Sequence, residues 1–278
     1  ALLDGIVRGA LGAPMRAVFA VGNERASPRC TTTGWRTIAP PAGAKNPITV
    51  GAVHSDTLEM TTFSSWGPTD DGRLKPDFVA PGCQVGGDGG VTSLEGLSDN
   101  QYRVMCGTSM AAPTFTGLAT LLLEDYRAHY PAPDPRNATL KAIFAQTAMD
   151  LGNEGPDYQF GYGLVQLVPA LELLRDRRFG EALVAAGETY AFDVEVAPGA
   201  SELRVTIAWD DVPAAANATT TLVNDLDLRL IAPDGSIYFP WTLDSAQPAN
   251  PAVRTQADHV NTIGQAFVAL PVAGTWSI

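Results

Sequence analysis

The sequence has little positive charge, few histidines and no long apolar run. It carries 18 basic and 30 acidic side chains, a net charge of -12 over 278 residues. Binding to nucleic acid needs clustered lysine and arginine, so a nucleic-acid partner is not expected. No apolar run approaches the roughly 20 residues of a membrane-spanning helix, which argues against an integral membrane protein. The opening stretch, ALLDGIVRGA, also lacks the basic start and the apolar segment of a signal peptide.

Cysteine is scarce as well, and its number is odd. Cys30, Cys83 and Cys106 match no zinc-binding spacing. They allow either one disulfide with one free thiol or three reduced buried thiols, and the sequence favours neither. Glycine and proline are abundant instead, with 27 and 21 residues, so the chain is rich in turns. Its hydrophobic content of 45% is ample for one or two packed cores.

The first part of the chain has the pattern of an α/β fold. A short helix is expected over residues 2–11, before Gly12. Continuous apolar runs at 17–21 and 48–53 are typical of strands buried on both faces of a parallel sheet. A further short strand is expected at 78–79. Helices are predicted at 108–129, 137–149 and 164–178. The first of these is apolar nearly all round, which predicts burial in the middle of a domain.

Beyond Gly180 the pattern changes to an alternation of polar and apolar residues. This alternation is typical of half-buried strands in an antiparallel sandwich or jelly roll. The alternating segments are 189–196, 203–209 and 226–231. The chain is therefore expected to divide into an α/β domain, 1–180, and a β-domain, 187–278. The second holds 11 acidic and only 3 basic groups, which raises the prospect of bound cations.

The segment with the most chemical information is GTSMAAP, residues 107–113. It places Ser109 at the start of a helix, directly after a glycine turn. The first turn of a helix offers backbone N–H groups that lack intrahelical partners, and it carries a partial positive charge. An anion that forms beside the Ser109 hydroxyl would be stabilised there. The position alone, however, is far more typical of an ordinary helix cap.

The surrounding residues favour the catalytic interpretation. GTSMAAP resembles the nucleophile segment of subtilisin-like serine proteases. The similarity extends to the strand VGAV before it and to the motifs in between, and it covers roughly residues 1–178. The in-between motifs are FSSWGP, KPD and APG, at residues 63–68, 75–77 and 80–82. The resemblance implies a parallel-sheet protease domain in which Ser109 is the nucleophile, a peptide or protein as substrate and an extracellular location.

Asn23 acquires a role from the same resemblance. AVGNE, residues 20–24, is similar to the family's strand and turn that carry the asparagine of the oxyanion hole. The backbone N–H of Ser109 would be the second donor. Ala20, Val21 and Gly22 would then line the pocket for the residue before the scissile bond, and their small size suggests room for a sizeable apolar side chain. No cofactor is required for this chemistry.

A serine nucleophile needs a base and an orienting carboxylate, and neither is evident. His54, His129 and His259 are the three histidines, and none lies in a motif that resembles the family's catalytic histidine. In this family the catalytic Asp and His precede the asparagine strand. We therefore expect the chain to be the C-terminal portion of a longer protease that is inactive alone. The alternative is a non-catalytic relative that acts as a binding protein through its β-domain.

Residues 188–278 resemble the jelly-roll domain appended to some bacterial subtilisin-like proteases. The similarity rests on VTIAWD, NDLDL, APDG and GTW, which begin at residues 205, 224, 232 and 274. Asp225 and Asp227 alternate and would project from one face of a strand. Clustered carboxylates are the ligands that calcium prefers, so we expect a structural calcium site there. The alternative is a solvated acidic surface.

Overall fold

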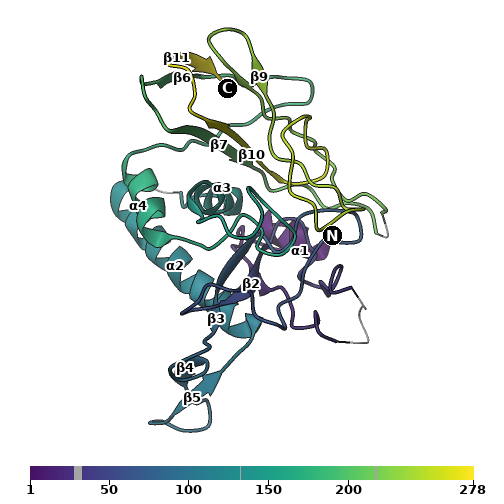
Figure 1. Cartoon of the computed structure of the whole chain (residues 1–278), viewed down its shortest axis with the longest axis vertical. Helices are drawn as coiled ribbons and strands as arrows, with labels where there is room; N and C mark the ends of the chain where they lie inside the picture. The colour runs from purple at the N-terminus through teal and green to yellow at the C-terminus, as the bar shows by residue number, and fades with distance from the viewer. Residues whose placement is uncertain (28–32, 132, 217) are drawn as a thin grey trace.

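The computed structural model describes residues 1–27, 33–131, 133–216 and 218–278 (Figure 1). Cys30 lies outside the described residues. In the N-terminal part the elements are α1 (Leu2–Val7), β1 (Val18–Ala20), β2 (Ile48–His54), β3 (Phe78–Cys83), β4 (Val91–Leu94), β5 (Tyr102–Met105), α2 (Thr108–His129), α3 (Asn137–Thr147) and α4 (Leu167–Arg175). In the C-terminal part they are β6 (Asp193–Val196), β7 (Glu202–Ala208), β8 (Leu230–Ile231), β9 (Ile237–Tyr238), β10 (Ile263–Ala269) and β11 (Gly274–Ser277).

The N-terminal part is built on a parallel sheet with the strand order β1-β2-β3. The strands pair in register from Val18 opposite Ile48 and from Val50 opposite Phe78. The first six residues of β2 are all buried, as the unbroken apolar run predicts. Helix α2 packs against all three strands. The expectation of a parallel sheet with helices is confirmed, and α1 is shorter than expected because it ends at Val7.

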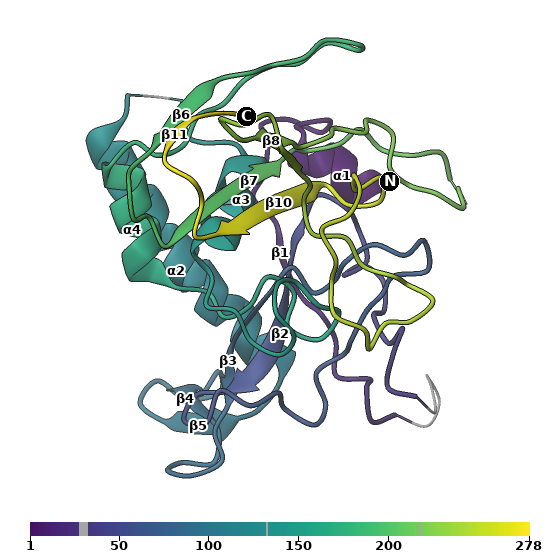
Figure 2. The same cartoon turned by 45° about the horizontal axis from the view of Figure 1, so that its top comes forward.

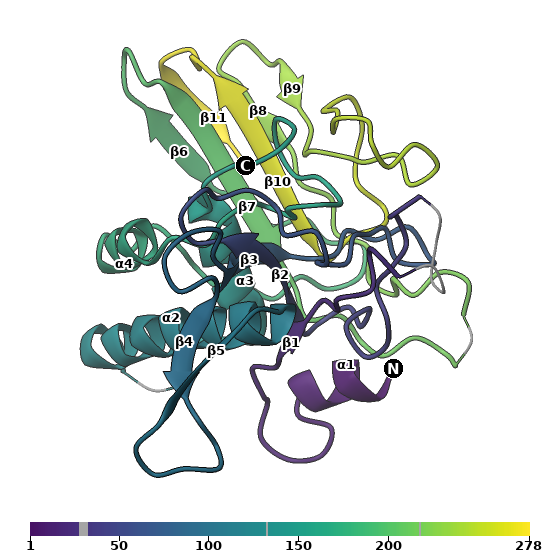
Figure 3. The same cartoon turned by 60° about the horizontal axis from the view of Figure 1, so that its bottom comes forward.

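Helix α2 has the predicted bounds but not the predicted surroundings. The expectation that it is buried nearly all round is wrong for the described residues. One face is buried against the sheet, with Phe115 and Leu122 at its centre. Pro113, Thr116 and Gly117 are exposed on the other face, and Leu121 is 49% exposed there. Figure 3 shows the helix running along a single side of the strands.

The C-terminal part consists of antiparallel strands. Strand β7 pairs with β10 along its whole length, and a second sheet has the order β6-β11-β8-β9 (Figure 2). Apolar side chains of both sheets share one core, which includes Leu230, Ala266 and Trp276. One of the three expected strands forms close to its predicted position, as β7, whereas the 189–196 segment is a strand only from Asp193 onward, as β6. The third is wrong in extent, because only Leu230–Ile231 of the 226–231 segment pairs as a strand.

The two parts meet through a broad contact. Helix α3 packs on β7 and β10, and in Figure 1 it lies between this pair of strands and the parallel sheet β1-β2-β3. At the same junction, the ammonium of Lys45 lies 2.6 Å from a carboxylate oxygen of Asp211, and both side chains are almost fully buried. Ile263 of β10 belongs to the same apolar core as the parallel sheet. The apolar packing is thus continuous from the N-terminal into the C-terminal part.

One exposed element, the β4–β5 hairpin, had no counterpart among the predicted strands. It projects from the carboxyl end of β3, away from the rest of the molecule (Figures 1 and 3). A disulfide joins Cys83 to Cys106 at its base, which settles the pairing of these two cysteines. None of the described helices is both long and apolar enough to cross a membrane.

Candidate active site

Ser109 is an exposed residue in the first turn of α2. The carbonyl of Gly107 accepts hydrogen bonds from the N–H groups of Met110 and Ala111, so the N–H groups of Thr108 and Ser109 are left for partners outside the helix. The preceding residue, Thr108, is 1% exposed and fixes the start of the helix. The hydroxyl and the backbone N–H of Ser109 are consequently presented at one end of a rigid, partly buried element.

Asn23 lies beside this turn and is held by Thr108. Its amide oxygen Oδ1 accepts hydrogen bonds from the backbone N–H and the hydroxyl of Thr108, both at 3.0 Å. Because a backbone N–H can only donate, the atom facing it must be the oxygen, and the amide nitrogen Nδ2 must face the other way. A Cβ built on Gly107 would lie 3.6 Å from both Asn23 Nδ2 and Ser109 N. Two N–H donors therefore flank the same small volume.

Thr108 was not assigned a role in the sequence analysis, yet it organises the site. Besides orienting Asn23, its hydroxyl oxygen accepts a hydrogen bond from the backbone N–H of Gly22 at 3.3 Å. It thus ties the turn after β1 to the first turn of α2, across 86 residues of sequence. Its place inside the GTSMAAP segment was the only signal in the sequence that could have drawn attention to it.

The segment Ala20–Gly22 passes close to this turn, but not as a simple apolar wall. The side chain of Val21 is fully buried, and its N–H donates to the carbonyl of Val50. Gly22 has a φ of +113°, and a Cβ at this position would collide with the Glu24 carboxylate. Glu24 Oε2 lies 3.1 Å from the hydroxyl of Ser65. Backbone and a carboxylate therefore make up much of the surface beside Gly22.

Sequence comparison identifies the family to which this site belongs. A model described as the subtilase family, Peptidase_S8, matches residues 3–163, more than half of the 278 residues. The chain belongs to the subtilase family. The antiparallel region after residue 163 lies outside that match.

Several curated proteins are similar to parts of this subtilase. It is 28% identical over 215 residues to the serine protease/ABC transporter B family protein tagA of Dictyostelium discoideum, covering 66% of the chain and 12% of that protein. It is 36% identical over 98 residues to the C5a peptidase of Streptococcus pyogenes, a match that covers 34% of the chain and 8% of that protein. It is 39% identical over 101 residues to the serine protease AprX of Bacillus subtilis, a match that covers 32% of the chain and 23% of that protein. The chain therefore spans less than a quarter of each relative. Among solved structures, the prenylagaramide maturation protease PagA matches with a TM-score of 0.44 and 23% identity, covering 58% of this chain and 50% of that one.

The three histidines of this subtilase make no hydrogen bond with Ser109 in the part of the chain that the structure describes. His54 is the last residue of β2. His129 ends α2, 20 residues after Ser109, which is about 30 Å along the helix axis. Its Nδ1 lies 2.8 Å from the carbonyl oxygen of Asp125. His259 lies in the C-terminal part and pairs with Asp225.

Asp225 and Asp227 do lie near each other, together with His259. The Nδ1 atom of His259 is 2.7 Å from Asp225 Oδ2 and 3.7 Å from Asp227 Oδ1, and all three residues are exposed. The expected strand does not form here, since β8 begins only at Leu230. The hydrogen bond with Asp225 and the nearby negative charges raise the pKa of His259. Carboxylate oxygens suit calcium, whereas an imidazole beside them suits it less well.

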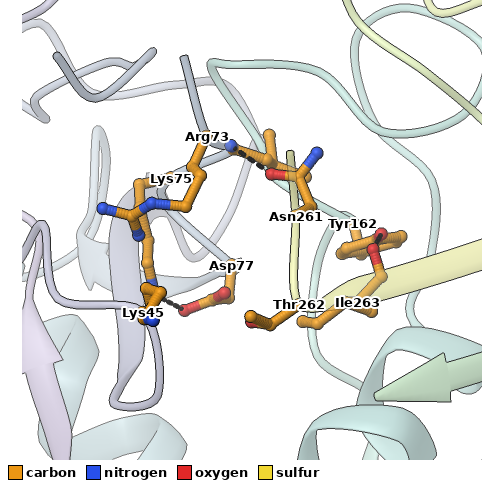
Figure 4. A pocket seen from close by; sticks show the side chains of 9 residues that line it. Lys45, Arg73, Lys75, Asp77, Tyr162, Asn261, Thr262 and Ile263 are labelled. Atoms are coloured by element: carbon orange, nitrogen blue, oxygen red, sulfur yellow. Dashed lines mark hydrogen bonds and ion pairs between the residues drawn. The ribbon is translucent and has the colours of Figure 1, made fainter. Parts of the chain in front are cut away.

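A second polar cluster lies at the opposite end of β3 from the Ser109 turn (Figure 4). Lys75 Nζ is 2.6 Å from Asp77 Oδ2 and donates to the carbonyl of Pro47, and the side chain is fully buried. Burial lowers the pKa of Lys75 to about 7, although the nearby Asp77 opposes this shift. The adjoining cavity of about 10 Å³ holds one water at most. Ligands of such sheets bind at the carboxyl ends of the strands, so we regard this cluster as structural.

Proposed function

We propose that this subtilase hydrolyses peptide bonds through an acyl-enzyme on Ser109, with Asn23 in the oxyanion hole. The observation that carries the proposal is the orientation of the Asn23 amide. Thr108 occupies its oxygen, so the Nδ2 donor and the Ser109 N–H flank one volume beside the serine hydroxyl. Two fixed donors at the place where negative charge develops are what acyl transfer requires.

In the first step, Ser109 Oγ attacks the carbonyl carbon of the substrate, and the carbonyl oxygen becomes an oxyanion. Asn23 Nδ2 and the Ser109 N–H donate hydrogen bonds to this oxygen. The intermediate collapses as the C–N bond breaks, and the amine departs with a proton. A water molecule then hydrolyses the ester on Ser109. A base must remove the serine proton and return it to the amine.

The described histidines do not reach Ser109, so the base and its carboxylate would have to come from outside these 278 residues. We propose that the chain is inactive by itself for this reason. A neutral serine hydroxyl without a base is a weak nucleophile. The proposed hydrolysis requires no metal or organic cofactor.

The test is labelling by a fluorophosphonate, which reacts with activated serines. The chain alone should label no faster than the Ser109→Ala variant. Supplied with the Asp- and His-bearing segment of a subtilase domain, it should label at Ser109, and Asn23→Ala should slow the reaction by roughly 10²–10³-fold, the loss known for the equivalent amide of subtilisin itself. Rapid labelling of the chain alone would contradict the absence of a base. Labelling of the assembled protein at another residue would overturn the role of Ser109.

We further propose an extracellular location, a jelly-roll topology for residues 187–278, and a domain boundary between residues 180 and 187. The Cys83–Cys106 disulfide supports the first point, because disulfides persist in oxidising compartments. The substrate is a peptide or protein, as the family implies. Ala20, Val21 and Gly22 would border the residue before the scissile bond, Val21 through its backbone because its side chain is buried. Calcium held by Asp225 and Asp227 would serve stability rather than chemistry.

The second candidate is a binding protein without catalysis. The observation that favours it is the lack of a histidine hydrogen-bonded to Ser109 in the described structure. The two functions differ in one measurement. A catalytic subtilase labels at Ser109 once the Asp- and His-bearing segment is supplied, and a binding protein does not.

A further inference from the structure

The disulfide between Cys83 and Cys106 occupies a distinctive place relative to the candidate nucleophile. Cys83 is the last residue of β3, and Cys106 stands between the end of β5 and the Gly107 turn. Their Cα atoms are 4.6 Å apart. Only Gly107 and Thr108 separate Cys106 from Ser109. The covalent link therefore fastens the residues just before Ser109 to the carboxyl end of the central sheet.

The β4–β5 hairpin does little to hold itself in place, although the N–H groups of Val85 and Gly86 at the start of the closed loop donate to the Asp56 carboxylate. In the β4–β5 hairpin, Thr92 and Leu94 pair with Val104 and Tyr102. Their side chains form an exposed face, where Leu94 is 75% and Tyr102 is 72% exposed. Seven of the eight strand residues are exposed and the eighth is only half-buried. An isolated two-stranded hairpin of this kind is marginally stable in water, so its own packing cannot fix the residues at its base.

The residues at its base are those that set the geometry of the site. Gly107 N–H donates to the carbonyl of Gly82 at 2.9 Å, and these two residues are the chain neighbours of Cys106 and Cys83. Thr108 N–H then donates to Asn23 Oδ1. The hydrogen bond and the disulfide together form a two-point clamp on the turn. Reactions that depend on oriented donors are sensitive to small displacements, and about 1 Å can cost 10²-fold in rate.

We propose that the Cys83–Cys106 disulfide is a positioning element of the Ser109 site, and that its reduction releases the Gly107–Thr108 turn and lowers the reactivity of the site. The inference rests on the proposed role of Ser109. In the reduction, a dithiol supplies two electrons and two protons. The S–S bond breaks, two thiols form, and the dithiol becomes a disulfide. The hairpin is then free to move at its base, and Thr108 loses its fixed relation to Asn23.

The first test measures amide hydrogen exchange of the chain with the disulfide intact and after reduction by dithiothreitol. We expect exchange of the hydrogen-bonded N–H groups of Gly107 and Thr108 to become at least ~10-fold faster on reduction, while exchange within α3 stays unchanged. The double variant Cys83→Ser/Cys106→Ser should match the reduced chain without reductant. Cys30→Ser retains the disulfide and should behave as the unaltered chain. Faster exchange confined to residues 84–105 would overturn the inference, because the disulfide would then stabilise the hairpin alone.

The second test uses the protein supplied with the Asp- and His-bearing segment. Fluorophosphonate labelling of Ser109 should slow by ~10-fold or more on reduction, with kcat for a peptide substrate falling more than KM rises. Equal labelling rates before and after reduction would overturn the positioning role while leaving Ser109 as the nucleophile. Absence of labelling in the oxidised, assembled protein would instead overturn the proposed function, and the exchange measurement would still decide whether the disulfide orders the turn.

Discussion

The amide of Asn23 owes its orientation to Thr108, a buried side chain that makes no contact with any substrate atom in the proposed mechanism. An amide group has two ends of similar shape, and its hydrogen-bond partners decide which one faces the solvent. Two donors of Thr108 bind the oxygen end, so the donor end faces the other way, toward the place where we propose that the oxyanion forms. Ser109 and Asn23 could be singled out as candidate site residues from the sequence because each lies in a contiguous motif. The partnership of Thr108 with Asn23 could not, because it joins residues 85 positions apart.

His259 provides a prediction at the scale of one residue. Its hydrogen bond with Asp225 raises its pKa above the usual 6.5. Because the pKa is raised, the pairing contributes fully to stability below pH 6.5. This contribution is lost as the pH rises through the pKa that His259 has in the folded state. We expect the NMR titration of the His259 ring to show a midpoint above 6.5, and Asp225→Asn to bring it back toward that value.

The same titration tests the proposed calcium site. A cation bound by Asp225 and Asp227 would repel the imidazolium, so saturating calcium should lower the His259 midpoint, and EDTA should lower the melting temperature of the protein. An unchanged His259 midpoint together with an unchanged melting temperature would leave the two carboxylates as a solvated surface.

At the scale of elements, Gly82 of β3 lies against both β2 and the start of α2. A Cβ at this position would lie 2.7 Å from both the Ala52 Cβ and the Gly107 carbonyl oxygen. We expect Gly82→Ala to destabilise the fold by about 1–3 kcal/mol, because overpacking forces the helix and the strand apart. Chemical denaturation measures the change in the free energy of unfolding.

Gly96→Ala is the matched control for this substitution. Gly96 lies in the hairpin with nothing within 4 Å of its added Cβ and without a left-handed φ. The Gly96→Ala variant should have the same midpoint of chemical denaturation as the unaltered chain. Equal midpoints for the two variants would show that β3 and α2 can separate at no cost, contrary to the packing seen around Gly82.

The strand β8 illustrates why some elements could not be predicted. The alternation over 226–231 shows which side chains face the core, and Leu228 is indeed buried. A strand also needs a partner with free hydrogen-bonding groups. On one side, β11 reaches only as far as Ile231, and on the other, β9 pairs only with Leu230 and Ile231. The sequence pattern predicts the burial of a side chain, whereas the extent of a strand depends on distant segments.

At the scale of the whole molecule, one buried ion pair joins the N-terminal and C-terminal parts. Asp211 binds the Lys45 ammonium and also accepts hydrogen bonds from the N–H groups of Val223 and Asn224. Burial alone would raise the pKa of Asp211, but these partners outweigh it and lower the pKa. The ionised Asp211 therefore contributes fully to the free energy of unfolding above about pH 4, and this contribution is lost as the pH falls through the lower pKa that Asp211 has in the folded state.

We expect Asp211→Ala to destabilise the molecule by about 3–5 kcal/mol at neutral pH, because it leaves the Lys45 ammonium buried without a counter-charge. The unfolding free energy, measured by urea denaturation, checks this. The exposed pair of Arg178 with Asp176 is the control, and Asp176→Ala should cost about 1 kcal/mol or less. A similar loss of unfolding free energy in both variants would mean that the buried pair stabilises the molecule no more than the exposed pair does.

The closed loop at the base of the hairpin also affects how damage to this protein would be detected. Its tip is open to other proteases, since Leu97 is 95% exposed and the strands bury almost none of their side chains. A cut anywhere between Gln84 and Met105 would leave two fragments joined through Cys83 and Cys106. Such a nicked molecule would migrate as an intact chain on a non-reducing gel and separate into two pieces only after reduction.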